Sequence, residues 1–175
     1  QLVMSYRIFV WFATACLSQS VSEDQQPTGN VYCAGAELSA SEIRELIKQD
    51  GISYLSEMMN FPGVLAREPG VMEKIRIARE LGCPVDGHAP GLRGEEARRY
   101  ADAEIATDHE CSTLSEALDK LTAGMKILIR EGSAAKNYDA LHPLIDSHTD
   151  QCMFCSDDKH PDDLVKGHIN DLVRR

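Results

Sequence analysis

The sequence alternates short apolar runs with longer amphipathic runs, and this alternation constrains the fold more than any other feature. Gly, Pro or a residue typical of a helix N-cap marks each change between the two kinds of run. We expect strands at Ile8–Ala13, Ile52–Ser56, Pro84–Gly87, Glu104–Thr107, Lys126–Arg130 and Cys152–Cys155. Helices are expected at Ser39–Gln49, Pro69–Leu81, Leu92–Ala103, Thr113–Ala123, Ala134–Asp146 and Pro161–Val173. The repeated order of strand and helix predicts an α/β fold with a parallel sheet and outer helices.

Two parallel architectures compete, an open doubly wound sheet and a closed (β/α)8 barrel. A dinucleotide-binding sheet carries a glycine-rich turn after its first strand, whereas the segment after Ala13 reads TACLSQS. The barrel is therefore favoured. Because only six strand-helix units are visible, we expect a partial TIM-like barrel that lacks two of its eight strands and has a gap between the first and last strands present.

Composition and charge exclude several classes of protein. A chain of 175 residues that is 43% hydrophobic and 26% charged suits one globular domain. Its formal charge of -10, with no block of Lys and Arg, argues against nucleic acid as a partner. The six cysteines are few and lie mostly in apolar runs, so they are interpreted as reduced packing residues, which favours the cytoplasm. Cys152 and Cys155 with His160 have half the spacing of a zinc site, but no second CxxC motif accompanies them.

The first residues allow two interpretations. The stretch around Ile8–Ala13 has one arginine, an apolar run and small residues, which resembles a weak signal peptide. It is aromatic, β-branched and short, so we interpret it as a buried strand that is too short to span a bilayer. The sequence opens on Gln1 and ends on LVRR inside a helical pattern. We therefore expect a piece of a longer protein.

Titratable residues gather where the expected strands end. The endings contain Glu57, Met58 and Asn60; Asp86 and His88; Asp108, His109 and Glu110; Arg130 and Glu131; and Asp157 and Asp158. One such ending is usually a solvated loop. Five in succession project to one rim of a barrel, where barrel enzymes place their chemistry.

Histidines and carboxylates on one rim would supply nitrogen and oxygen ligands, which suit Zn, Mn or Fe(II) better than Ca or Mg. A metal in such a setting makes hydrolysis the expected reaction class. Spacing alone names no substrate. The other histidines have simpler interpretations: His142 and His148 are expected to face solvent, His160 to lie near the rim at a helix start, and His168 to be structural.

Five motifs, LSEMMNFPGVL, PVDGHAPGL, TDHECST, ILIREGSAAKN and FCSDDKHPDDL, resemble those of the adenine deaminases in the amidohydrolase superfamily. The resemblance runs from about Leu38 to the C-terminus, in the family's order and spacing. It implies that Glu57, His88, His109 and Asp157 are metal ligands from the fourth, fifth, sixth and eighth barrel strands. Asp157 is chosen over Asp158 because the family's aspartate directly follows a Ser or Thr.

The resemblance also implies roles in catalysis and substrate binding. Asp157 would accept a proton from the water that attacks C6 of adenine, and Glu110 would contact the purine ring and deliver a proton. The implied pocket residues are Asn60, Arg130, Glu131 and Ser133. The implied reaction is the hydrolysis of adenine, a small-molecule purine, to hypoxanthine and ammonia in purine salvage. A homo-oligomer is compatible with this assignment.

One departure from the family pattern is that no His-x-His pair occurs, although the superfamily carries one at the end of its first barrel strand. If Ile8–Ala13 is the third strand, residues 1–175 form an incomplete amidohydrolase barrel domain without the first two strands and the C-terminal domain. The family uses a binuclear divalent metal centre and supports Mn or Fe, whereas the residues alone also permit Zn. On its own, such a fragment is expected to be inactive.

Two other functions remain open from the sequence. The chain is compatible with another amidohydrolase that acts on a different purine or a cyclic amide. It is also compatible with a non-catalytic remnant that binds a metal or ligand, because the His-x-His ligands are absent.

Neighbouring residues in TDHECST cannot all face a metal, because side chains alternate in direction along a strand. We expect His109 to point into the rim, Asp108 to turn away or support a neighbouring loop, and Glu110 to reach the substrate.

Overall fold

The computed structural model describes residues 38–49 and 52–175, and its strands form one parallel sheet. The strands are β1 (Leu55–Met58), β2 (Val85–Gly87), β3 (Thr107–Asp108), β4 (Lys126–Arg130) and β5 (Cys152–Cys155). They lie in the order β1-β2-β3-β4-β5, and each pairs with the next in parallel. Strands that are consecutive in the chain are therefore neighbours in the sheet, as in a (β/α)8 barrel.

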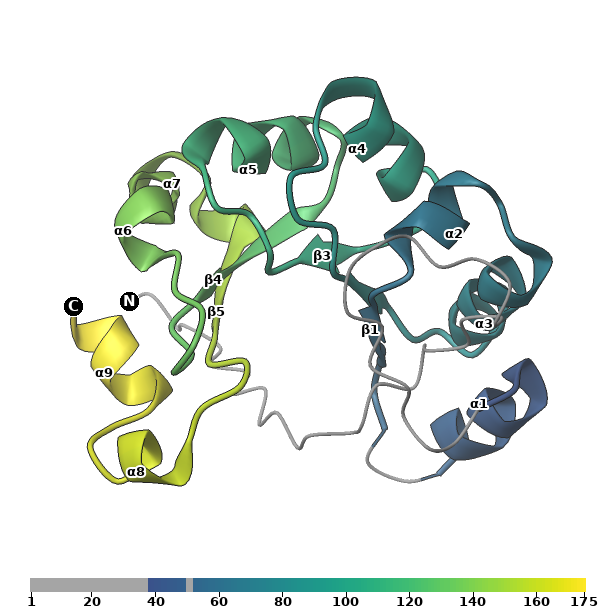
Figure 1. Cartoon of the computed structure of the whole chain (residues 1–175), viewed down its shortest axis with the longest axis horizontal. Coiled ribbons are helices and arrows are strands. Elements are labelled where there is room, and N and C mark those ends of the chain that lie inside the picture. Colours follow the sequence, from purple (N-terminus) through teal and green to yellow (C-terminus); the bar gives the residue numbers. More distant parts are fainter. Residues whose placement is uncertain (1–37, 50–51) are drawn as a thin grey trace, which may run out of the picture.

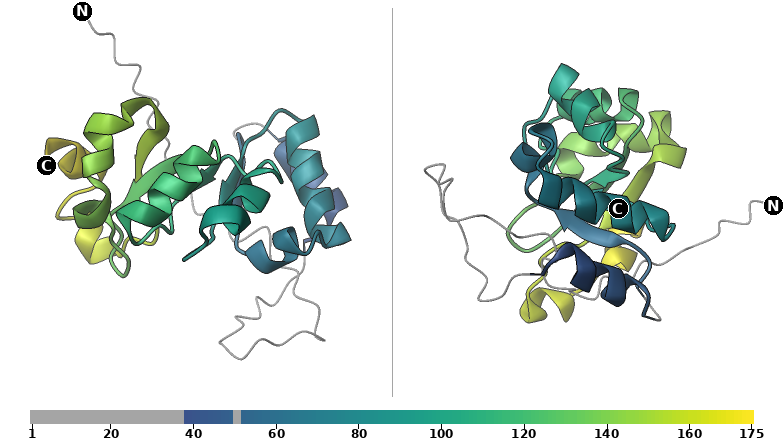
Figure 2. Two further views of the ribbon diagram at one scale, coloured as in Figure 1. Left: turned by 90° about the horizontal axis from the view of Figure 1, so that it is seen from above. Right: turned by 90° about the vertical axis from the view of Figure 1, so that its right-hand side faces the viewer.

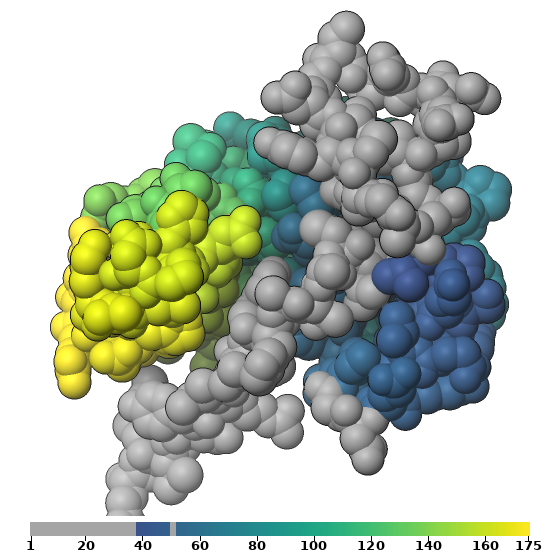
Figure 3. All heavy atoms as spheres, turned by 60° about the horizontal axis from the view of Figure 1, so that its bottom comes forward, coloured from purple at the N-terminus to yellow at the C-terminus, as the bar shows by residue number. Residues whose placement is uncertain are grey.

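Helices cover the outer side of the strands. They are α1 (Ala40–Ile47), α2 (Phe61–Leu65), α3 (Pro69–Glu80), α4 (Gly94–Ala101), α5 (Leu114–Thr122), α6 (Tyr138–Leu141), α7 (Pro143–Ser147), the 3-10 helix η1 (Thr149–Gln151), α8 (Pro161–Leu164) and α9 (Ile169–Arg174). Figure 1 shows α2 to α7 in an arc around the sheet, and Figure 2 shows the same arrangement from above. In the space-filling view, α1 and the α8–α9 pair lie on opposite sides of the molecule (Figure 3). These features confirm the predicted α/β fold and partial TIM-like barrel.

Two expected strands begin three residues later than the sequence suggested. The strand expected at Ile52–Ser56 is β1, which starts at Leu55 and ends at Met58, so it contains Glu57. The strand expected at Glu104–Thr107 is β3, which starts at Thr107. Glu104 has a left-handed backbone with φ of 69°, a conformation that no strand residue adopts. Each expected range overlaps its strand, but it begins in the residues that precede the strand.

Two expected helices are divided. The helix expected at Ala134–Asp146 becomes α6 and α7, because Pro143 has no N–H to continue the first helix. The helix expected at Pro161–Val173 becomes α8 and α9, with Gly167 between them. Helix α2 was not expected at all, and it begins where Asn60 Oδ1 accepts a bond from the Gly63 N–H at 2.9 Å. The strand expected at Ile8–Ala13 lies outside the described residues.

Local signals account for well-formed helix starts. Ser39 caps α1, since its hydroxyl accepts a bond from the Glu42 N–H and the Glu42 carboxylate accepts one from the Ser39 N–H. Thr113 caps α5 in the same way through Glu116 N–H. None of the helices in the described segments is long and apolar enough to cross a membrane.

The core lies between the sheet and these helices. One buried cluster joins β1 and β2 to α1 and α3 and includes Ile43, Leu55 and Ile75. A second joins β4 to α5, α6 and α7 and includes Ile127 and Leu141. Burial of such side chains stabilises the domain by about 1.5 to 3 kcal/mol for each fully buried residue. Both clusters lie on the helix side of the sheet, which leaves the C-terminal strand ends available for polar groups.

Gly87 allows β2 and β3 to approach each other, and we predict that Gly87→Ala is destabilising. A Cβ at this position would meet Thr107 O at 2.6 Å and the Ile105 and Tyr100 side chains at 2.7 and 2.9 Å. The expected loss in the free energy of unfolding is about 1 to 3 kcal/mol, from overpacking. Chemical denaturation of the protein at its native length would measure it.

The matched control is Gly70→Ala in α3, where a Cβ meets nothing within 4 Å. That change should leave stability equal or raise it by up to about 1 kcal/mol, because Ala favours helix. Equal stability for the two variants would show that Gly87 is not required for strand packing.

Candidate metal centre

Three side chains from successive strand ends converge on one point. Glu57 lies in β1, His88 follows β2, and His109 follows β3. Glu57 Oε2 lies 2.7 Å from His109 Nε2 and 3.3 Å from His88 Nδ1. The two imidazole rings are 5.4 Å apart and nearly perpendicular. One ligand atom from each of the three residues falls within 4.8 Å of the others, so a single cation could contact all three.

A second group continues from this point along the rim. His109, Glu110 and Asp157 also bring one ligand atom each within 4.8 Å of one another. Glu110 Oε1 lies 3.4 Å from His88 Nδ1 and 3.6 Å from His109 Nε2. Arg130 bridges the two acids, because its Nη1 donates to Glu110 Oε1 and lies 2.5 Å from Asp157 Oδ2. The two groups share His109, which makes it the centre of the cluster.

Asp157 rather than its neighbour faces this cluster. Its backbone is left-handed, with φ of 48°, a conformation that aspartate tolerates better than most residues. Its Oδ1 accepts a bond from the Asp158 N–H at 2.8 Å, and its Oδ2 faces Arg130. Asp158 is exposed. The geometry therefore supports the choice of Asp157 over Asp158 as the residue of this cluster. The role of Asp157 as a ligand and a base stays a prediction.

The electrostatics of the cluster favour a cation. Glu57, Asp86, Glu110 and Asp157 supply four carboxylates against two cationic groups, the guanidinium of Arg130 and the imidazole of His109. Burial alone would raise the pKa of Glu57, but hydrogen bonds with His109 and His88 lower it to about 2. Burial would likewise lower the pKa of His109, but Asp86 and Glu57 raise it to about 10. A buried imidazole between two carboxylates marks a place of concentrated negative charge.

Asp108 lies on the other side of β3, as expected. It is fully buried, and its Oδ2 accepts a bond from the Ala89 N–H at 2.9 Å, which supports the loop after β2. Its Oδ1 accepts from Glu110 N–H and from Lys120 Nζ, both at 2.9 Å. The prediction that Asp108 turns away and supports a neighbouring loop is confirmed.

Two buried residues with a part in the site were missed by the sequence reasoning. Asn137 accepts a bond from the Arg130 N–H at 2.6 Å and donates to the carbonyls of His109 and Cys111 at 3.2 and 3.0 Å. Tyr100 donates to Met58 O at 3.0 Å and accepts from the His88 N–H at 3.2 Å. Each joins neighbouring strand ends. The signal available for Asn137 was its place inside the REGSAAKN motif, and Tyr100 had none, since it lies within a helix.

Three of the expected pocket residues have other contacts. Asn60 caps α2, and its amide donates to Glu68 Oε2 at 3.4 Å. Ser133 donates to Asp163 Oδ2 at 2.7 Å and accepts from the His160 N–H at 2.8 Å, so it joins the loops after β4 and β5. Glu131 lies in a separate hollow beside the cluster. Their contacts with a substrate stay predictions.

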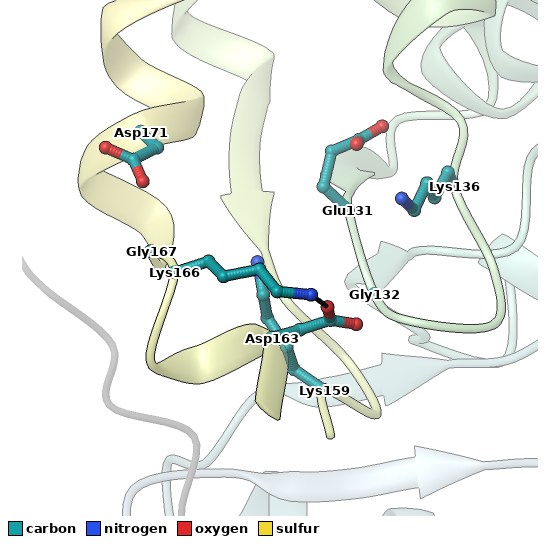
Figure 4. Close-up of a pocket in the computed structure, with 8 residues that line it drawn as sticks. All are labelled: Glu131, Gly132, Lys136, Lys159, Asp163, Lys166, Gly167 and Asp171. Atoms are coloured by element: carbon teal, nitrogen blue, oxygen red, sulfur yellow. Dashed lines mark hydrogen bonds and ion pairs between the residues drawn. The ribbon is translucent and has the colours of Figure 1, made fainter. Parts of the chain in front are cut away.

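That hollow has a volume of about 180 Å3 and lies between the loop after β4 and the α8–α9 segment (Figure 4). It is lined by Glu131, Gly132, Lys136, Lys159, Asp163, Lys166, Gly167 and Asp171. Its three lysines are matched by three acids, and Lys166 Nζ lies 3.0 Å from Asp163 Oδ1. The balance of charge gives it no preference for an anion or a cation.

The remaining histidines and cysteines are outside the cluster. His142 is exposed as expected, whereas His148 is half-buried and contacts the Ser147 hydroxyl. His160 is exposed at the start of α8, and exposed His168 lies 3.2 Å from Ser156 Oγ through Nε2. Neither ligand group found in the described residues contains Cys152, Cys155 and His160, the alternative zinc set.

The donor set fits a divalent transition metal. Two imidazoles with carboxylates are preferred by Zn, Mn and Fe(II), and the excess negative charge would be neutralised by such an ion. A partial (β/α)8 barrel with these groups at its C-terminal rim places the chain in the class of barrel enzymes that draw their chemistry from strand ends.

Comparison with known proteins names the family within that class. A model of the amidohydrolase family matches residues 4–173, and the chain belongs to this family. It is 57% identical over 142 residues to an adenine deaminase of Salinibacter ruber, covering 81% of this chain and 26% of the relative. For adenine deaminases of Sulfurovum sp. and Parabacteroides distasonis the identities are 54% over 149 residues and 43% over 168 residues. These cover 85% and 95% of this chain, and 28% and 29% of the relatives. The chain thus spans less than a third of the length of each of these proteins.

Removal of the shared imidazole should abolish metal binding. We predict that His109→Ala in the protein at its native length lowers Mn(II) affinity by at least about 100-fold, more than the loss typical of an outer-shell residue. The reason is that His109 belongs to both ligand groups. Metal content after dialysis, measured by atomic emission, is the readout.

His142→Ala is the matched control, because His142 is exposed and outside the cluster. It should retain the parent's metal content. Full retention of metal by His109→Ala would contradict the ligand set.

Proposed function

We propose that the protein is a metal-dependent adenine deaminase that hydrolyses adenine to hypoxanthine and ammonia. The observation that carries the proposal is the meeting of Glu57, His88 and His109 with Glu110 and Asp157 on one rim, in a chain similar to proteins named adenine deaminase. The similarity to those proteins supports the choice of adenine among the substrates of the family.

In this proposal Glu57, His88, His109 and Asp157 are the metal ligands. A divalent ion held there would act as a Lewis acid and make a water molecule acidic near neutral pH. We favour Mn or Fe from the family resemblance, and Zn fits the same donors. A binuclear centre would need ligands beyond the described residues, such as the His-x-His pair of the family.

The carboxylates of Asp157 and Glu110 would divide the proton transfers. Asp157 accepts a proton from the water as its oxygen adds to C6 of adenine. Glu110 contacts the purine and delivers a proton, so that the bond between C6 and the exocyclic nitrogen breaks and ammonia leaves. Arg130 contacts both acids, and its guanidinium would hold them on the same side of the substrate. Asn60, Glu131 and Ser133 are proposed as more distant parts of the pocket.

The proposal extends to the cellular setting. Cys83, Cys111, Cys152 and Cys155 are free thiols, and purine salvage is a cytoplasmic process, so we place the enzyme in the cytoplasm. Its partner is a small purine. A homo-oligomer stays a prediction.

Activity on a panel of ring compounds tests the substrate. The protein at its native length, loaded with Mn(II), should release ammonia from adenine and do so much more slowly from guanine, cytosine and dihydrouracil. Ammonia release and hypoxanthine formation would be measured together. Preference for guanine or for the cyclic amide would identify a different amidohydrolase, and inactivity of a metal-loaded protein on every compound would identify a non-catalytic metal-binding protein.

Glu110→Gln separates proton transfer from metal binding. We predict that this variant keeps the parent's metal content and loses about 10²- to 10⁴-fold in kcat on adenine, because an amide cannot deliver the proton. The measurement combines metal analysis with steady-state kinetics.

Glu95→Gln is its control, since Glu95 is exposed in α4 and belongs neither to a ligand group nor to the expected pocket. Its kcat should remain within a few-fold of the parent. Turnover at the parent rate by Glu110→Gln would remove the role proposed for Glu110, and loss of metal from that variant would make it a ligand instead.

A further inference from the structure

Asp86 lies directly behind the central imidazole of the cluster. It is in β2, only 4% exposed, and its Oδ2 is 3.2 Å from Nδ1 of His109. The opposite ring nitrogen of His109, Nε2, is 2.7 Å from Glu57 Oε2. The imidazole is thus held between two carboxylates, one on each nitrogen. Neither ligand group of the described residues includes Asp86.

The carboxylate of Asp86 is itself fixed by the next strand. Asp86 is paired with Thr107 in the register of β2 and β3, and the Thr107 hydroxyl donates to Asp86 Oδ1. With that oxygen engaged, the other is directed at His109. The strand pairing therefore sets the position of the carboxylate, and the carboxylate can set the position of the ring.

A neutral imidazole binds a cation through one nitrogen and keeps its proton on the other. A carboxylate next to the protonated nitrogen selects that tautomer, orients the ring and makes the free nitrogen a better ligand. At His109 the nitrogen beside Asp86 is Nδ1, which leaves Nε2 for the cation, on the side where Glu57 and Glu110 lie.

We propose that Asp86 is a positioning residue of the metal centre, which holds His109 with its proton on Nδ1 and presents Nε2 to the metal. This inference rests on the metal site of the proposed function, but not on adenine as the substrate. Asp86 acts through His109 and does not touch the substrate or the metal. Thr107 lies in β3 and His109 directly follows this strand. The same strand therefore supplies the proposed metal ligand and the hydroxyl that holds Asp86 in place.

The test is Co(II) binding by the protein at its native length, in the parent and in Asp86→Asn. Asparagine keeps the shape and an acceptor for Thr107 but removes the charge beside Nδ1. We expect Co(II) affinity, measured by competition with a chromogenic chelator, to fall about 10- to 100-fold. The visible absorption bands of the bound Co(II) should also shift, because the imidazole becomes a weaker ligand. A purely structural role would move neither readout.

Asp119→Asn is the matched control. It makes the same change at a carboxylate in α5 that contacts Arg93 and the Gly94 N–H rather than an imidazole. It should keep the parent's Co(II) affinity and spectrum. Parent affinity and spectrum in Asp86→Asn would overturn the proposal.

Thr107→Val covers the case in which Asp86→Asn does not fold. It retains the carboxylate but releases its Oδ1, so Co(II) affinity should fall in the same direction by a smaller factor, with the same shift in the bands. An unchanged spectrum and affinity would again overturn the role of Asp86. A parent protein that binds no Co(II) would overturn the proposed metal site itself, whereas a parent that binds Co(II) but does not deaminate adenine would overturn only the substrate and leave this test valid.

Discussion

The buried ammonium of Lys120 is the interaction on which the candidate site depends. Its side chain has no exposed surface, and Nζ donates to Ala89 O, Asp108 Oδ1 and Glu116 Oε1 at 2.6, 2.9 and 3.1 Å. Burial lowers the pKa of Lys120, but Asp108 and Glu116 raise it above its usual value, so the group remains charged. Removal of one partner from such a buried pair costs about 3 to 5 kcal/mol. The partners belong to the loop after β2, the end of β3 and α5, and these include the segments that carry both imidazoles.

The carboxylates at the C-terminal strand ends repel one another. Cationic side chains that each contact two of these carboxylates offset the repulsion. Arg130 lies between Glu110 and Asp157, so acids from the ends of β3 and β5 are held by a base from β4. His109 has the same place between Glu57 and Asp86. Parallel strands make this possible because their C-terminal ends meet at one edge. The charge that remains is negative, and a divalent cation would complete the balance.

Two patterns in the sequence predicted much of the fold and of the candidate site. The predictions failed where contacts between distant residues determine the structure. Alternation of apolar and amphipathic runs identified the parallel sheet, and polar strand ends identified Glu57, His88 and His109. The start of β3 could not be found from apolarity, because the left-handed turn at Glu104 ends the preceding segment first. Residues such as Tyr100 and Asn137 act through bonds to backbone atoms of distant strands, and such bonds leave no local pattern. Asp86 was predicted to lie at the end of a strand. Its contact with Thr107 depends on the register of β2 and β3, which the sequence alone does not give.

The register also explains how one strand end can serve both the fold and the site. Side chains alternate between the two faces of a strand, so Thr107 and His109 point to one face and Asp108 to the other. The first face carries the bond from Thr107 to Asp86 and the central imidazole, and the second carries the bond from Lys120 to Asp108. A slip of one residue would exchange these faces, and it would place a carboxylate where the imidazole lies and an imidazole beside the buried ammonium. The pairing that satisfies Lys120 is therefore the same pairing that directs His109 to the candidate metal centre.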